Sequence, residues 1–89
     1  MTPRFSVIIP AFNAAATLAR ALESVRAQSW PAHEILVVDD GSSDATAEIA
    51  RQFGGAVRLI QQPNSGVSAA RNAGAAVATG DWLAFLDAD

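Results

Sequence analysis

The sequence predicts an α/β protein in which a parallel, doubly wound sheet of Rossmann-like topology carries helices on both faces. Four short, largely apolar segments alternate with three segments of helical periodicity, in the order βαβαβαβ. The apolar segments are continuous rather than alternating, which is typical of strands that are covered on both faces. Because strand–helix–strand crossovers are right-handed and join parallel strands, this order favours a parallel sheet.

The four predicted strands end at turn-forming or polar residues. They cover residues 5–9, 35–38, 57–60 and 82–86. The residues that end them are Pro10, Asp39, Gln61 and Asp87. The last strand consists only of apolar residues, so we expect it to be buried.

Three segments between the strands carry apolar side chains at helical spacing. In the first, the stripe comprises Leu18, Leu22 and Val25, and the helix is expected to end near Trp30-Pro31. In the second, it comprises Ala45, Ile49 and Phe53, with Ser43 or Asp44 as the N-cap and Gly54-Gly55 at the end. In the third, it comprises Val67, Ala70, Gly74 and Val77. Many alanines accompany the third stripe, so we expect this helix to lie close to the sheet.

Length and composition indicate one globular unit and exclude several classes of protein. The chain has 89 residues, of which 51% are hydrophobic, and a net charge of −3. It contains no lysine and no basic block, so nucleic-acid binding driven by phosphate neutralisation is not expected. The absence of cysteine excludes a disulfide framework, a cysteine-ligated zinc site and a thiol nucleophile.

No segment has the length of about 18 apolar residues that a membrane span requires. The apolar run after Arg4 is short and ends at Pro10, unlike that of a secretory signal. We therefore expect a cytoplasmic protein, with the cytoplasmic face of a membrane as the alternative for the full-length protein.

The residues that follow the predicted strands are rich in carboxylates and amides. They include Asn13, Asp39, Asp40, Asn64, Asp87 and Asp89. Parallel strands share one carboxyl edge, and open α/β sheets bind ligands in the crevice beyond that edge. The alternative is that Asp and Asn collect here only because turns favour them.

Asp87 and Asp89 are one residue apart, and two like charges at about 4 Å repel each other by roughly 1–4 kcal/mol. A divalent cation removes that cost, because hard ions take carboxylate oxygen ligands. Two solvated turn residues are the alternative. A cation here would hold a diphosphate, with Asp40 as an acceptor for a base N–H. Phe12 either offers a ring surface to the base or lies in the core. A nucleotide-diphosphate site is the favoured interpretation.

Other nucleotide and catalytic sites find less support. No G-x-G-x-x-G motif follows the first strand, and the chain lacks the lysine that a P-loop requires. His33 is the only histidine and precedes the second strand. We expect it at the opposite edge of the sheet, so a Ser-His-acid site is not expected.

Four segments resemble, in order, the opening motifs of family 2 glycosyltransferases. They are residues 5–13 (FSVIIPAFN), 37–44 (VVDDGSSD), 64–74 (NSGVSAARNAG) and 80–89 (GDWLAFLDAD). The last segment ends in a DxD motif. Each motif alone is weak, but together they follow the family's order and cover nearly the whole chain. The resemblance implies a GT-A fold.

The resemblance also implies a reaction. A sugar is transferred, with inversion, from a nucleotide-diphosphate sugar to a hydroxyl group of a glycan, a lipid-linked molecule or another acceptor. We expect a UDP-linked donor and a divalent metal ion, Mn²⁺ or Mg²⁺. Cell-envelope polysaccharide biosynthesis is the kind of process in which such an enzyme is expected.

The resemblance assigns expected roles to residues around the nucleotide. Pro10, Phe12 and Asp40 are expected to contact the donor base, and Asn13 is expected in the same nucleotide-sugar site. Position 12 is often tyrosine in the family, so Phe12 keeps the stacking face and lacks a hydroxyl. Asp39 either serves this pocket or braces its loop.

The diphosphate and the metal involve three further residues. Asp87 is expected near the ribose and the metal, and Asp89 is expected as a metal ligand. Arg71 either approaches the diphosphate or pairs with a loop carboxylate, and we favour the pairing.

An inverting displacement also needs a base, which in this family lies downstream of the DxD motif. We expect this base beyond residue 89. Asp81 is no substitute, because it precedes the last strand and lies away from the site. Residues 1–89 are therefore interpreted as the amino-terminal, nucleotide-sugar-binding part of a GT-A domain, truncated after the fourth strand and inactive alone.

Two functions of other classes remain as alternatives. A receiver-like signalling module would account for Asp39-Asp40, but such modules need a later lysine, which is absent. A nucleotidyltransferase also uses a metal and a nucleotide, but it would show a basic, glycine-rich loop after the first strand.

Overall fold

The computed structural model describes residues 3–28 and 32–88 and confirms the predicted order of elements. The strands are β1 (Phe5–Ala11), β2 (Glu34–Asp39), β3 (Val57–Gln61) and β4 (Trp82–Phe85). The helices are α1 (Leu18–Arg26), α2 (Thr46–Phe53) and α3 (Val67–Val77). Trp30-Pro31, where α1 was expected to end, and Asp89 lie outside the described residues. Among the described residues, α1 ends at Arg26.

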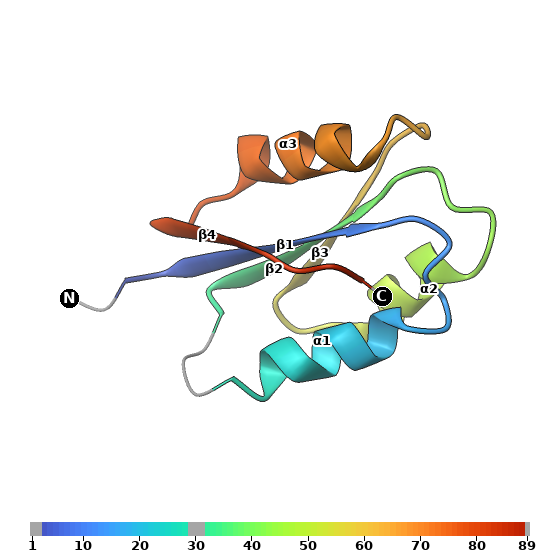
Figure 1. The fold of residues 1–89 in the computed structure, drawn as a ribbon. Coiled ribbons are helices and arrows are strands. Elements are labelled where there is room, and N and C mark those ends of the chain that lie inside the picture. Colours follow the sequence, from blue (N-terminus) through green and yellow to red (C-terminus); the bar gives the residue numbers. More distant parts are fainter. Residues whose placement is uncertain (1–2, 29–31, 89) are drawn as a thin grey trace.

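The four strands form one parallel sheet in the order β3-β2-β1-β4 (Figure 1). Ile8 of β1 lies opposite Leu36 of β2 on one side and Phe85 of β4 on the other. The chain builds outward from β1 to β3 and then crosses back to place β4 on the far side of β1. The order of strands therefore reverses between β1 and β4, where open α/β sheets bind their ligands.

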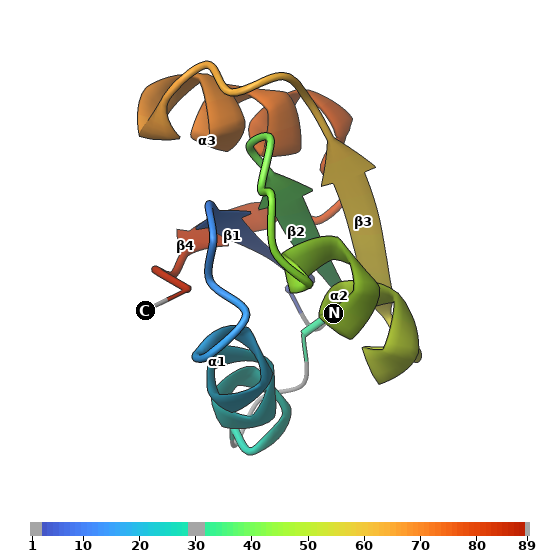
Figure 2. The same ribbon diagram turned by 90° about the vertical axis from the view of Figure 1, so that its right-hand side faces the viewer.

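Helices cover both faces of the sheet, as predicted: α3 lies on one face, and α1 and α2 lie on the other (Figure 2). Successive side chains of a strand point to opposite faces. Val7 and Ile9 therefore pack in the core under α1 and α2, whereas Ile8 packs in a second core with Ala70 of α3. The continuous apolar pattern of β1 and β2 follows from this cover on both faces.

Helix α3 lies close to the sheet, also as predicted. A Cβ atom at Gly74 would lie 2.6 Å from Ile8 Cγ2 and 3.3 Å from Val38 Cγ2, so only glycine fits this crossing. The predicted apolar stripe is wrong at its ends, because Val67 and Val77 are exposed. A helical period predicts which side of a helix faces the sheet, but it does not predict how far along the helix the sheet extends.

The prediction of a buried fourth strand is also wrong. Trp82 is 60% exposed and Phe85 is 51% exposed, and Leu83 and Leu86 are exposed as well. Strand β4 is at the edge of the sheet, and in the described part of the chain it pairs only with β1. The apolar composition of a segment therefore does not show whether the strand lies at the edge or in the middle of the sheet.

The start of α2 differs from the prediction by one position. The N-cap is Ala45, which has no side-chain oxygen to offer. The carboxylate of Asp44 nevertheless accepts the N–H of Thr46, the first helical residue, at 3.0 Å. The predicted end is confirmed, since Gly54 and Gly55 adopt positive φ angles of 70° and 65°. None of the helices in the described ranges has the length and apolar character needed to cross a membrane.

Candidate nucleotide site

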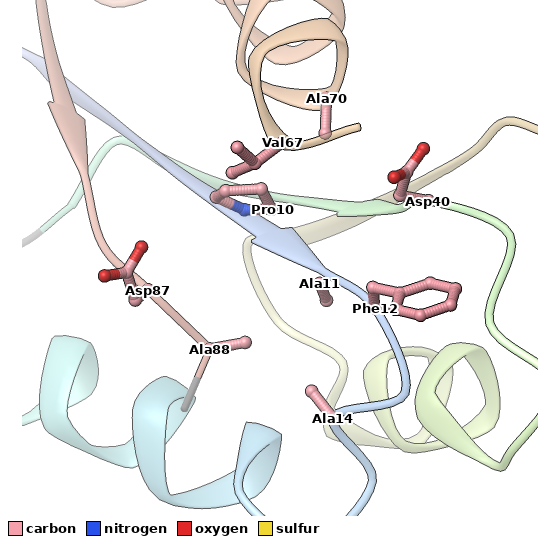
Figure 3. Close-up of a pocket in the computed structure, with 9 residues that line it drawn as sticks. All are labelled: Pro10, Ala11, Phe12, Ala14, Asp40, Val67, Ala70, Asp87 and Ala88. Carbon is pink, nitrogen blue, oxygen red and sulfur yellow. The ribbon is translucent and has the colours of Figure 1, made fainter. Parts of the chain in front are cut away.

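A pocket of about 200 Å³ opens at the carboxyl edge of the sheet, beside the end of β1. Its lining comes from the end of β1 and the following loop, from the residue after β2, from the first turns of α3 and from the segment after β4. The lining residues are Pro10, Ala11, Phe12, Ala14, Asp40, Val67, Ala70, Asp87 and Ala88 (Figure 3). The pocket therefore lies at the position where the strand order reverses.

Four of the predicted site residues line this pocket, namely Pro10, Phe12, Asp40 and Asp87. Phe12 is 53% exposed, so the alternative that it belongs to the core is wrong. Pro10 is buried and forms part of the pocket wall.

Three other predicted residues, Asn13, Asp39 and Arg71, do not line the pocket, and Asp89 lies outside the described residues. Asp40 and Asp87, which follow β2 and β4, line the same pocket at this edge of the sheet.

The carboxylate of Asp40 is held by the segment that leads into α3. Its Oδ1 accepts hydrogen bonds from Gln62 Nε2 at 2.9 Å and from the Ser65 N–H at 2.8 Å. Its Oδ2 accepts the Gly66 N–H at 2.9 Å. The bond from the Gln62 amide, followed by the two backbone N–H bonds, outweighs burial and lowers the pKa of Asp40. Asp40 is therefore an ionised acceptor that also orders the entrance to α3.

Glycine at position 41 allows the loop after β2 to approach this segment. Gly41 has a φ of +79°, and a Cβ atom there would lie 2.6 Å from the backbone nitrogen of Asn64. Asn64 in turn donates from Nδ2 to the backbone oxygen of Asp40 at 3.0 Å. The positive φ and the lack of space both require glycine.

Asp39 and Asn13 brace the loops around the pocket. Asp39 is buried, and its Oδ1 accepts the Ser42 N–H at 3.0 Å, so the structure favours the bracing alternative for this residue. Asn13, at a φ of 49°, accepts the Ser43 N–H at 2.9 Å and donates its own N–H to the Ser42 hydroxyl at 2.8 Å. These bonds join the loop after β1 to the loop after β2.

Among the described residues, the side chain of Asp87 has fewer polar partners than that of Asp40. Its side chain is 71% exposed, and its one ion pair in the described ranges is with Arg71, from Oδ1 to Nη2 at 3.8 Å. Arg71 therefore lies within ion-pair distance of the carboxylate that follows β4. Within residues 3–28 and 32–88, no group of three or more histidine or acidic side chains is placed to hold a metal ion. An exposed carboxylate with little competition from the protein suits a hard divalent cation as a ligand.

Sequence reasoning missed part of this site. The small residues that line it include Ala11, Ala14, Ala70 and Ala88. Nothing in one sequence distinguishes an alanine that leaves space for a ligand from one that permits close packing. The donors to Asp40, from Gln62, Ser65 and Gly66, were also missed. The sequence does show a polar segment directly after a predicted strand. It does not show that this segment would form hydrogen bonds with Asp40.

Fold and pocket together define a Rossmann-like α/β protein with a ligand site at the reversal of its strand order, lined by an exposed aromatic ring and two carboxylates. The family model described as "Glycosyl transferase family 2" matches residues 6–89, and the chain belongs to this family. Membership of this family confirms the GT-A architecture expected from the motifs and disfavours the receiver-like and nucleotidyltransferase alternatives.

Individual relatives cover nearly all of this chain. The "Uncharacterized glycosyltransferase YibD" of Escherichia coli (strain K12) is 46% identical over an alignment 91 residues long, which covers 99% of this chain and 26% of that protein. The mannosyltransferase PcManGT from Pyrobaculum calidifontis, solved in complex with GDP-Man and Mn²⁺, superimposes with a TM-score of 0.92 at 30% identity. This match covers 100% of the present chain and 28% of PcManGT.

A third relative is TarS 1-349 of S. aureus, solved in complex with UDP-GlcNAc. It superimposes with a TM-score of 0.90 at 33% identity, over 97% of this chain and 26% of that one. The present chain thus spans about a quarter of the length of these relatives.

Proposed function

We propose that residues 1–89 bind the nucleotide-diphosphate sugar donor, together with a divalent metal ion, in an enzyme that transfers the sugar to an acceptor hydroxyl with inversion. The observation that carries the proposal is the convergence of Asp40, Asp87 and the exposed ring of Phe12 on one pocket at the carboxyl edge of the sheet. Structures of TarS with UDP-GlcNAc and of PcManGT with GDP-Man, which share this fold, support it.

In this proposal, Phe12 and Pro10 provide the surface against which the donor base packs. An exposed aromatic ring at a pocket edge offers a flat face for stacking. Asp40 lines the same pocket as an ionised acceptor and takes a base N–H. That N–H shares or replaces the position that the Gln62 amide holds at Oδ1. Asn13 and Asp39 support the site by bracing its loops.

Asp87 and Asp89 are the proposed ligands of Mn²⁺ or Mg²⁺. The fit rests on Asp87, which offers an exposed carboxylate whose one ion pair among the described residues is at 3.8 Å. When bound, the cation neutralises the diphosphate and stabilises the negative charge that grows on this leaving group. Arg71 lies beside Asp87 and adds a positive charge on the same side of the pocket.

We propose that the catalytic base and the acceptor site belong to residues outside 1–89. This chain corresponds to about a quarter of the relatives that it matches. The isolated segment is then expected to bind a nucleotide weakly and to transfer no sugar. A cytoplasmic location, a UDP-linked donor and a role in cell-envelope polysaccharide biosynthesis remain parts of the proposal.

The test is a titration of the full-length protein with UDP, GDP, UDP-GlcNAc and GDP-Man, each with and without Mn²⁺. We expect binding of one nucleotide class that Mn²⁺ tightens at least about tenfold, equivalent to about 1.4 kcal/mol. Replacing Asp89 by Asn in the full-length protein is expected to abolish metal-dependent transfer. Absence of nucleotide binding would refute the proposed function, and unchanged transfer by Asp89→Asn would remove that residue from the metal site.

A further inference from the structure

A second cluster of polar side chains lies at the opposite, amino end of the sheet. Glu34, the first residue of β2, is only 7% exposed. Its Oε2 accepts hydrogen bonds from the Ser6 hydroxyl at 2.7 Å, from the Thr79 N–H at 2.6 Å and from the Thr79 hydroxyl at 3.0 Å. Ser6 Oγ in turn accepts the Gly80 N–H at 2.8 Å. We call Ser6, Glu34, Thr79 and Gly80 the amino-end network.

The amino-end network joins the connection between α3 and β4 to both central strands. Ser6 belongs to β1 and Glu34 to β2, and the two residues lie opposite each other in the sheet. Thr79 and Gly80 lie between the end of α3 and the start of β4. The network is thus the place where one carboxylate links three segments that are far apart in the chain.

The approach at Gly80 leaves no room for a side chain. A Cβ atom at Gly80 would lie 2.6 Å from Ser6 Oγ and 2.8 Å from the Ser6 backbone nitrogen. The next residues extend the attachment, because Asp81 and Trp82 donate their N–H groups to the backbone oxygen of Arg4 at 2.7 and 3.1 Å. The start of β4 is therefore held tightly against β1.

Beyond its start, β4 is held by its pairing with β1. The Leu86 N–H also donates to the backbone oxygen of Ile8 at 3.0 Å, and Ala88 is buried in the core. The strand has four residues, it pairs with β1 alone in the described part of the chain, and three of its four side chains are exposed. Asp87 lies two residues beyond the end of this strand and lines the pocket. The register of β4 against β1 therefore decides where the Asp87 carboxylate emerges.

We propose that Glu34 is a positioning residue for the metal side of the donor site: through Ser6, Thr79 and Gly80 it fixes the register of β4 and thereby the position of Asp87. This inference rests on the proposed function, because its first test measures how a metal ion changes nucleotide binding. Glu34 does not touch the pocket, and Asp40 reaches the pocket from β2 without involving β4. Loss of the Glu34 carboxylate is expected to affect the metal side of the site and to spare the base side.

The first test measures UDP binding to the full-length protein with and without Mn²⁺. In Glu34→Ala, the tightening of UDP binding by Mn²⁺ is expected to fall at least about fivefold, while UDP binding without metal stays within about twofold of wild type. Glu34→Gln is expected to retain most of the tightening, because its amide oxygen can take the Oε2 position. Glu48→Gln, at an exposed residue of α2, is the matched control and should behave like wild type.

The second test measures amide hydrogen exchange along β4 and needs no nucleotide. Glu34→Ala is expected to speed exchange at residues 82–85 at least about tenfold without a matching change in α2. Thr79→Val removes one hydroxyl donor and is expected to show a smaller effect of the same kind, so it serves if Glu34→Ala does not fold.

The two tests separate the two proposals. Equal weakening of UDP binding with and without Mn²⁺ in Glu34→Ala, or an unchanged gain from Mn²⁺, would overturn the positioning role. Unchanged exchange in β4 would overturn it as well. If Mn²⁺ does not tighten UDP binding to the wild-type protein, the proposed metal site fails, and the exchange result alone decides on Glu34.

Discussion

The two ends of the parallel sheet carry carboxylates in opposite situations. At the amino end, Glu34 is buried and accepts three hydrogen bonds at one oxygen. At the carboxyl end, the Asp87 side chain is 71% exposed and, within the described part of the chain, forms one ion pair at 3.8 Å. A carboxylate whose acceptor positions are filled by the protein stabilises the fold, whereas one with free positions can bind a ligand. Asp40 combines both properties, because it lines the pocket and also holds the 62–66 segment.

The largest expected difference between the two ends concerns activity. Asp87→Asn in the full-length protein is expected to lower metal-dependent sugar transfer by roughly 100-fold or more, because it weakens the proposed cation site. Initial rates at several Mn²⁺ concentrations measure this. Glu48→Gln, which makes the same chemical change on exposed α2, should keep the wild-type rate. A wild-type rate in Asp87→Asn would show that the exposed carboxylate is not a metal ligand.

The second difference concerns stability, where the substitution at the amino end is expected to have the larger effect. Glu34→Ala is expected to lower the free energy of unfolding by about 2 kcal/mol, because Ser6 and the Thr79 N–H lose a charged acceptor. Asp87→Ala is expected to change it by less than about 0.5 kcal/mol, since the side chain is exposed. Urea denaturation of the full-length variants compares the two. Equal losses of unfolding free energy in the two variants would mean that the hydrogen bonds to Glu34 do not stabilise the fold more than the exposed Asp87 does.

The third expectation is a pH dependence that belongs to the amino end. Burial alone would raise the pKa of Glu34, but hydrogen bonds from the Thr79 N–H and from the Ser6 and Thr79 hydroxyls, with Arg58 nearby, lower it from 4.5 to about 2. The unfolded chain therefore binds a proton at a higher pH than the folded protein does. The stability that Glu34 contributes is complete above about pH 4.5 and is lost as the pH falls towards 2.

Denaturation of wild type and Glu34→Gln across this pH range provides the measurement. The lowered pKa values of Asp40, Asp44 and Asp81 act in the same direction in both proteins, so the comparison isolates Glu34. Wild type is expected to lose stability more steeply than Glu34→Gln below pH 4.5. Parallel curves would contradict a lowered pKa at this position.

The smallest expected effects are those of the exposed ion pairs at the two ends. Arg71→Gln removes the pair with Asp87 at 3.8 Å, and Arg4→Gln removes the pair with Asp81 at 3.5 Å. Each is expected to change the free energy of unfolding by less than about 1 kcal/mol, because water screens exposed pairs. Thermal denaturation at two salt concentrations detects such changes. A loss of several kcal/mol in the free energy of unfolding would show that the ion pair stabilises the fold although it is exposed.

Much of the fold was predictable from local patterns. The apolar runs of β1 and β2 and the stripe of Leu18, Leu22 and Val25 predicted elements that the structure confirms. The exposure of β4 was not predictable, because an edge strand and a central strand can have the same composition. Val67 and Val77 belong to the predicted apolar stripe but are exposed for a related reason, since burial depends on what lies opposite a residue.

The sequence alone decided the order of the elements, their parallel arrangement and the gathering of acidic residues at the carboxyl edge, because hydrophobic periodicity is local and crossovers have one handedness. Tertiary structure alone decided which carboxylates accept hydrogen bonds from other parts of the protein. Glu34 is satisfied by Ser6 and Thr79, and Asp40 by Gln62, Ser65 and Gly66. Those hydrogen bonds join segments far apart in the chain, and they form only when packing of the helices on the sheet brings donor and acceptor to about 3 Å.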